Sequence, residues 1–214
     1  NAYQKEEVYH GRVAKQSEDF LTKELKPLLE EMRIRNVSRK DFETYLWNRH
    51  APEANRQLAK VNDRLPDGGS GIMTADALRY MQSLPANKRE QYEILAKRID
   101  KISAENLRLS VEAGLEKQES VDAMRAAYKH YVPLFRSETS SGGGNGTGSG
   151  FSVSGATTKR RTGSEKPVDD IIAGLAMQRD NIITRAEKAV VGRALMGMAL
   201  ENPQDDFWFV FDPM

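Results

Sequence analysis

Apolar side chains recur every three or four residues along most of this chain, which predicts a protein built mainly of α-helices. The longest such stripe lies between residues 88 and 117, where the steps alternate between three and four as in a coiled coil. Its members are Tyr92, Leu95, Ile99, Ile102, Asn106, Leu109 and Ala113. Asn106 is the polar member of this stripe, and a buried asparagine fixes helix register at some cost in stability.

Capping residues and prolines predict where the first helices begin and end. Residues 2–34 carry one apolar stripe, and Pro27 within it is expected to kink the helix or divide it in two. Ser38 opens a capping-box-like sequence, which predicts the start of a second helix. Pro52 suits the first turn of a helix, so we expect that second helix to restart there.

A glycine-rich stretch, DGGSGIMTADA, spans Asp67–Ala77. A phosphate-binding loop of the nucleoside-triphosphatase type needs a lysine after the glycines, and none is present. A calcium loop needs acidic residues at alternating positions, which are also missing. The stretch is therefore predicted to be a corner between helices, in which Gly68, Gly69 and Gly71 allow positive φ and Thr74 caps the next helix.

Two further helices are predicted towards the end of the chain. Ser120 is expected to cap a helix that runs to Tyr131. Pro167 is expected to open a long final helix, with Asp169–Asp170 at its positive end and a stop at Asn202–Pro203.

The fold class expected is predominantly all-α, an elongated multi-helix bundle. Residues 1–136 form the helical bundle, and residues 137–150, which are rich in glycine and serine, form a flexible linker. Residues 151–214 contain a basic turn, the long helix and a strand-like aromatic tail centred on Phe207, Trp208 and Phe209. We expect this last part to pack on the first part or on the rest of a longer parent chain.

Composition narrows the classes of function. With 32 Lys and Arg against 31 Asp and Glu, the formal net charge is +1, so no global pull towards nucleic acid or acidic membranes is expected. The absence of cysteine excludes disulfides and thiolate chemistry. No apolar run approaches the ~20 residues of a membrane-spanning helix. The chain begins with Asn1, and we interpret it as a piece of a longer polypeptide.

Candidate catalytic or metal-binding chemistry is sparse. The histidines are His10, His50 and His130. The pair that could bind a metal or move a proton is His50 with Glu53, whose spacing suits one helix face. Pro52 lies between them and argues against a continuous helix, so hydrogen bonding between helices or capping is the favoured role. No nucleophile-and-base pair is evident, and no catalytic residue, metal or cofactor is predicted.

A basic run, Lys159, Arg160 and Arg161, follows the glycine-rich linker. Such a run can contact DNA phosphates and give binding that is independent of base sequence and weakens as salt rises. No aromatic side chains are interleaved for stacking on bases, and a solvated turn is the favoured alternative.

Several stretches occur in a fixed order along the chain. They are YHGRVAKQSEDF, YLWNRHAPEAN, LPDGGSGIMTADA, MRAAYKHYVPLFR, GFSVSG followed by TTKRRTG, and ITRAEKAVVGRAL followed by ENP. Together they resemble a region of the large polyvalent proteins of tailed bacteriophages, named after a Pro-Leu-x-Arg-Phe-Gly motif. Pro133–Arg136 matches the start of that motif, but Ser137 and Glu138 replace its Phe-Gly, and Ala54 stands where arginine is expected.

The resemblance implies a chain that is packaged in the virion and delivered with the genome. The first hypothesis is a non-enzymatic structural segment of an internal virion (ejection) protein that helps build the internal core or the genome-delivery conduit through helix packing. Its partners would be other copies or segments of the parent protein, and portal or other internal proteins, with no small-molecule substrate. It would lie inside the virion and, on infection, in the host envelope or cytoplasm.

The contact surfaces expected for this assembly are the stripe from Tyr92 to Ala113 and the aromatic tail from Phe207 to Phe211. A second hypothesis is a module that binds phage DNA through the basic run. An enzyme is the least favoured of the three.

Overall fold

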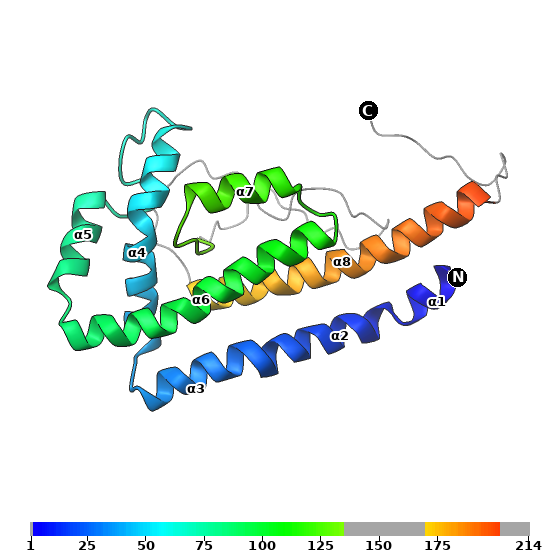
Figure 1. Cartoon of the computed structure of the whole chain (residues 1–214), viewed down its shortest axis with the longest axis horizontal. Coiled ribbons are helices and arrows are strands. Elements are labelled where there is room, and N and C mark those ends of the chain that lie inside the picture. Colours follow the sequence, from blue (N-terminus) through cyan, green and yellow to red (C-terminus); the bar gives the residue numbers. More distant parts are fainter. Residues whose placement is uncertain (1, 135–169, 202–214) are drawn as a thin grey trace, which may run out of the picture.

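The structure is a computed structural model that describes residues 2–134 and 170–201. Within these two ranges every regular element is helical, as the apolar periodicity predicts (Figure 1). The elements are α1 (Ala2–Glu7), α2 (Tyr9–Phe20), the π-helical turn η1 (Leu21–Leu25), α3 (Lys26–Ile34), α4 (Arg39–Ala59), α5 (Thr74–Ser83), α6 (Ala86–Glu112), α7 (Gln118–Ala127) and α8 (Ile171–Glu201).

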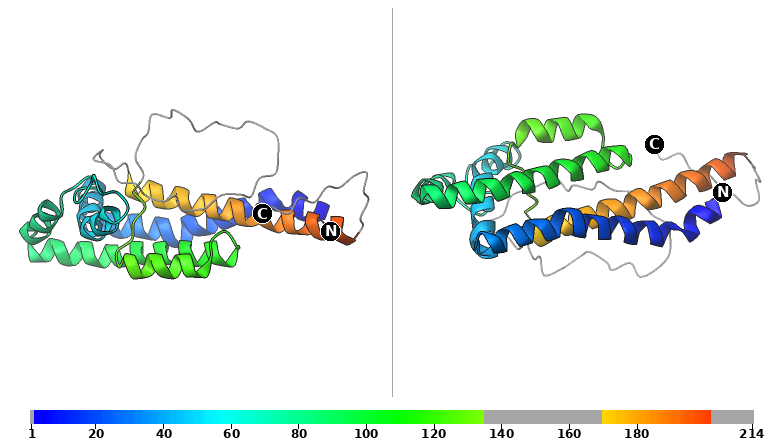
Figure 2. Two further views of the ribbon diagram at one scale, coloured as in Figure 1. Left: turned by 90° about the horizontal axis from the view of Figure 1, so that it is seen from above. Right: turned by 60° about the horizontal axis from the view of Figure 1, so that its bottom comes forward.

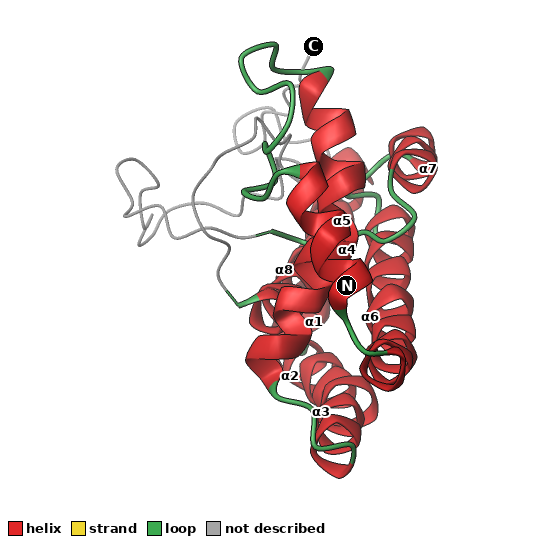
Figure 3. Cartoon of the chain, turned by 90° about the vertical axis from the view of Figure 1, so that its left-hand side faces the viewer, coloured by secondary structure: helices red, strands yellow, loops and turns green. Residues whose placement is uncertain are grey.

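Three long helical rods lie side by side and give the described part an elongated shape (Figure 2). The first rod consists of α2, η1 and α3 in sequence, and the other two are α6 and α8. α8 contacts α1, α2, α4 and α6, so part of the expected 151–214 segment does pack on the first part of the chain. α4 and α5 pack against each other at one end of the rods, and α7 lies beside α6 (Figure 3).

The predicted first helix changes its geometry just before Pro27. The chain stays helical from Tyr9 to Ile34, but η1 widens it to a π-helical turn in which the Lys26 N–H donates to the Leu21 carbonyl. In α geometry the Pro27 ring would clash with the carbonyl four residues earlier, and a wider turn is a common way to relieve such a conflict. Where a kink or a division was expected, the structure shows a continuous helical run with a local change of helix type.

α4 begins as predicted and then continues where a restart was predicted. The Ser38 hydroxyl accepts a hydrogen bond from the Asp41 N–H, which confirms it as the helix cap. The predicted restart at Pro52 is wrong, because Pro52 lies inside a continuous helix. Ala54, Asn55 and Leu58 continue the buried face of α4 beyond the proline. Tertiary packing along that face outweighs the loss of one backbone hydrogen bond.

The glycine-rich stretch is a corner between α4 and α5, as predicted. Gly68 and Gly71 have positive φ, of 74° and 95°, whereas Gly69 does not. The predicted cap is wrong in detail, since Thr74 is the first helical residue and is itself held by Asp67. The Asp67 carboxylate accepts hydrogen bonds from the Thr74 N–H at 3.0 Å and from its hydroxyl at 2.6 Å. Burial opposes the charge of Asp67, but these bonds outweigh it and lower the pKa of that carboxyl.

α7 starts and ends earlier than predicted. It spans Gln118–Ala127, so Ser120 is in its first turn and is not its cap, and Tyr131 lies beyond its end. The extended backbone of Lys117 precedes the helix, and the carbonyl of Lys117 accepts the N–H groups of Ser120 and Val121.

The hydrophobic core lies where α3, α4, α6 and the start of α8 meet. Its fully buried side chains include Leu28, Phe42, Tyr45, Leu46, Leu95, Ile99, Ile171 and Leu175. The rings of Phe42, Tyr45 and Tyr92 pack with centroids 5.1 to 6.5 Å apart. None of the helices in residues 2–134 and 170–201 is long and apolar enough to cross a bilayer.

Several predictions fall outside the described residues. They concern the 137–150 linker, the basic run Lys159–Arg161, the helix start at Pro167, the stop at Asn202–Pro203 and the aromatic tail Phe207–Phe211. Asp170, the last residue before α8, accepts the Ala173 N–H at 2.7 Å, which agrees with its predicted place at the helix N-terminus.

Candidate functional site: a buried polar network between three helices

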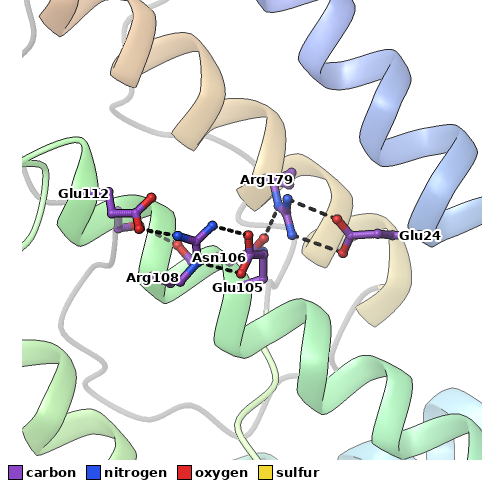
Figure 4. Close-up of polar contacts among 7 residues, drawn as sticks. Glu24, Glu105, Asn106, Arg108, Glu112 and Arg179 are labelled. Carbon is purple, nitrogen blue, oxygen red and sulfur yellow. Dashed lines mark hydrogen bonds and ion pairs between the residues drawn. The ribbon is translucent and has the colours of Figure 1, made fainter.

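Asn106, the predicted polar position of the α6 stripe, is fully buried and hydrogen-bonded on both sides of its amide. Its Nδ2 donates to Gln178 Oε1 at 3.2 Å and to the Leu175 carbonyl at 3.5 Å. Its Oδ1 accepts from Nε of Arg179 (Figure 4). These bonds fix the position of α6 along α8, which is the register role predicted for this residue.

Arg179 extends the network from α8 to the first rod. Its Nη1 and Nη2 lie 3.3 and 3.2 Å from the two carboxylate oxygens of Glu24 on η1, and its guanidinium carbon lies 4.7 Å from the centroid of the Phe20 ring. Burial lowers the pKa of Arg179, and the Glu24 carboxylate partly offsets this. One buried guanidinium thus links all three rods through Asn106 and Glu24.

Further polar contacts follow between α2 and α8, in the direction of the N-terminus of α2 and the C-terminus of α8. Glu187 accepts hydrogen bonds from Arg12 Nε and from Gln16 Nε2, each at 2.5 Å. Ser17 donates to Asp180 at 2.8 Å. We call these contacts, together with the Glu24–Arg179 pair, the polar row. In α2 only Phe20 is buried, so this interface depends on polar contacts far more than the core does.

The charged residues on the outer face of α6 pair within that helix and are more exposed than the buried network beside them. Arg108 bonds Glu105 and Glu112 within the same helix, with its Nε 2.8 Å from Glu105 Oε2 (Figure 4). The Arg108 side chain is half exposed. Ion pairs of this kind contribute little to stability because water and salt screen them.

A second polar cluster lies between α4 and α6. Arg49 forms two 2.8 Å hydrogen bonds with the carboxylate of Asp100, and the Tyr45 hydroxyl donates to Glu93. His130 approaches the same group, with Nδ1 4.0 Å from Asp100 Oδ2. Burial, and then the charge of Arg49, lower the pKa of His130, although neighbouring carboxylates oppose this.

The two residues of the predicted His50 and Glu53 pair contact different partners. Both lie on the continuous helix α4, so the argument that Pro52 separates them is wrong. His50 is fully buried against the rings of Tyr128 and Tyr131, with centroids 5.4 and 6.1 Å away. Glu53 accepts a hydrogen bond from the backbone N–H of His130 at 2.9 Å, and this bond joins α4 to the segment that follows α7. The described residues contain no group of three or more His, Asp or Glu side chains arranged for a metal ion.

The predicted contact residues of α6 are covered by helices of the same chain. Tyr92, Leu95, Ile99, Ile102 and Asn106 are buried, and Leu109 is half-buried. The stripe therefore mediates packing within the chain. The predicted contacts of Phe207, Trp208, Phe209 and the basic run lie outside the described residues and stay predictions.

Sequence reasoning missed Glu24, Gln178 and Arg179, which are the partners in the Asn106 network, and it missed the other members of the polar row as well. A signal was present in α8, where the four polar residues 178–181 interrupt an otherwise apolar stretch, IIAGLAMQRDNII. Buried charges need partners, so such an interruption indicates an interhelix bond.

No known family of proteins, no curated protein and no solved structure matches this chain.

Proposed function

We propose that this chain is a non-enzymatic, helix-packing structural segment of a large internal virion (ejection) protein of a tailed bacteriophage. It works as a stiff unit that keeps neighbouring parts of the parent protein at a fixed spacing in the internal core or in the genome-delivery conduit. The partners are other segments or copies of that parent protein, and the place of action is the virion interior and then the host envelope.

The observation that carries the proposal is the buried Glu24–Arg179–Asn106 network. Apolar packing alone tolerates sliding of one helix along another, whereas a buried polar group must meet its particular partner. A network that joins three rods at one level therefore gives a defined register along the long axis. Such a unit suits a role in which length and spacing matter, and the ordered sequence motifs supply the link to phage internal proteins.

The test is to map tryptic peptides from purified phage particles after separating the virion proteins by size. We expect peptides of this segment in one chain much longer than 214 residues. Detection in infected-cell extract but not in particles would contradict the proposal and favour a role in the host.

A second measurement concerns the stiffness on which the proposal depends. The chain has no cysteine of its own, so two introduced cysteines can each be given a spin label at a chosen position. Labels at exposed Lys23 on η1 and exposed Arg108 on α6 should give one narrow distance distribution in the full chain. A broad distribution would show that the rods slide, and would remove the argument from register.

A further inference from the structure

A groove opens between α2, α6 and α8 beside the polar row. Its volume is about 210 Å³, which exceeds the ~150 Å³ that holds a benzene ring in an apolar cavity. Leu109, Ile182, Ile183 and Val190 supply apolar lining. The polar lining comes from Gln16, Glu112, Glu187 and Arg193. The groove therefore has the size and chemistry to take an aromatic side chain.

An open stripe on α8 leads from this groove to the end of the helix. Ala186, Val190 and Arg193 line the groove, and Gly197 and Leu200 follow at the same three- and four-residue spacing. A Cβ added at Gly197 would meet nothing within 4 Å, and Leu200 is 63% exposed. Between Ala189 and Leu200 the helix has a single charged residue, Arg193. A helix that is apolar on nearly all sides is normally covered.

The chain that follows α8 has the length and composition to cover this stripe. On the helix, the groove lies about 12 Å (Arg193) to about 28 Å (Ile182) back from Glu201, at 1.5 Å per residue. The five residues Asn202–Asp206 can return at most about 17 Å, and the next five can cover about 17 Å more. The span reached by Phe207–Phe211, FWFVF, thus coincides with the groove. Asp205 and Asp206, just before it, carry charge opposite to Arg193.

We propose that the aromatic tail Phe207–Phe211 folds back along α8 and docks in the groove between α2, α6 and α8 of its own chain. The tail then adds apolar contacts at the end of the rods where α2 and α8 meet through the polar row. The inference does not depend on the proposed function, because it concerns only which segment covers this surface.

The test is disulfide cross-linking in the full chain. One variant carries Ala113→Cys, at the groove, and Phe209→Cys, in the tail. The matched control carries Ala104→Cys with Phe209→Cys, because Ala104 is exposed. It lies nine residues before Ala113, the C-cap of α6, and therefore on the opposite side of that helix. A docked tail should form the bond within monomers about tenfold faster at 113 than at 104, since docking raises the local thiol concentration.

Equal rates at 113 and 104 would overturn the proposal. A disulfide at 113 that forms only between two chains would also overturn it, because a second copy would then occupy the groove. Reducing and non-reducing gels separate these outcomes.

A second experiment leaves the tail residues unchanged. Trp47→Phe makes Trp208 the only tryptophan of the chain. Its fluorescence should be shifted to the blue and resist acrylamide quenching at every protein concentration. Adding Ala113→Arg should expose Trp208, whereas adding Ala104→Arg should not. A solvent-exposed Trp208 in the starting variant would contradict docking.

Discussion

The two ends of the rods are held together by different means. At the end near α4, fully buried side chains such as Leu28, Leu95 and Leu175 form the core. At the other end, α2 lies on α8 through the polar row, and only Phe20 of α2 is buried. Apolar contact supplies free energy in proportion to the area buried but has little direction. Paired polar groups add less free energy and specify which atoms must meet.

The largest effect is expected from a cavity in the apolar end. Leu95→Ala should lower the free energy of unfolding by about 2–5 kcal/mol, because Leu95 is fully buried and its neighbours can close the gap only in part. Urea unfolding followed by circular dichroism measures this. Leu78→Ala, at a side chain that is 48% exposed, is the control and should change stability by less than about 1 kcal/mol. Equal losses would show that Leu95 is not a core residue.

A smaller effect is expected where the two ends meet, at Asn106. Asn106→Leu should cost about 1–3 kcal/mol, because Gln178 and Arg179 keep their burial and lose a partner. Adding Arg179→Leu should recover part of that loss, since removing both partners costs less than removing one. A double-mutant cycle from urea unfolding gives the coupling energy. Strict additivity of the two changes would show that the network is not coupled.

A third and smaller loss in the free energy of unfolding, of about 1 kcal/mol, is expected from a change in the polar row. Glu187→Gln removes the charge that faces Arg12 and weakens the bond from Gln16. The loss should shrink as salt is raised, because the Arg12 side chain is about one-third exposed and its pair is partly screened. Glu30→Gln, in a well-exposed pair with Arg33, is the control and should have almost no effect. A loss that does not depend on salt would assign the role of Glu187 to packing.

The smallest effect concerns pH and His130. Because its pKa is lowered in the folded chain, the unfolded chain binds the proton first as pH falls below about 6.5. The contribution of His130 to stability is therefore complete above pH 6.5 and is lost as pH falls towards its folded pKa. His130→Gln should flatten the pH dependence of urea unfolding between pH 7 and 5. His10→Gln, at an exposed position, should leave it unchanged.

The parts of the fold that sequence predicts are those decided by neighbours in the chain. The periodic spacing of Leu95 and Ile99 and the hydroxyl of Ser38 act within a few residues, and both predictions are confirmed. Pro52 and Thr74 depart from the local rules. Pro52 stays inside a helix whose buried face continues past it. Thr74 is held by Asp67 within the loop and accepts a hydrogen bond from Asn55, 19 positions away.

Long-range pairing explains what sequence reasoning could not reach in the candidate site. Glu24 and Arg179 are 155 positions apart, so no local pattern indicates that they meet. The buried amide of Asn106 was predicted because it breaks an apolar stripe, yet its partners depend on which helix packs against it.

The π-helical turn η1 sets the rotational phase between the two halves of the first rod. One additional residue in a turn rotates every later side chain by about 100° around the axis. α2 can therefore direct Arg12, Gln16 and Ser17 towards α8 while α3 directs Leu28 and Met32 into the core. A single deletion within Leu21–Leu25 would bring both halves into one phase, and the rod could then satisfy only one of its two interfaces. The wider backbone turn alone produces this rotation between α2 and α3, whatever side chains η1 carries.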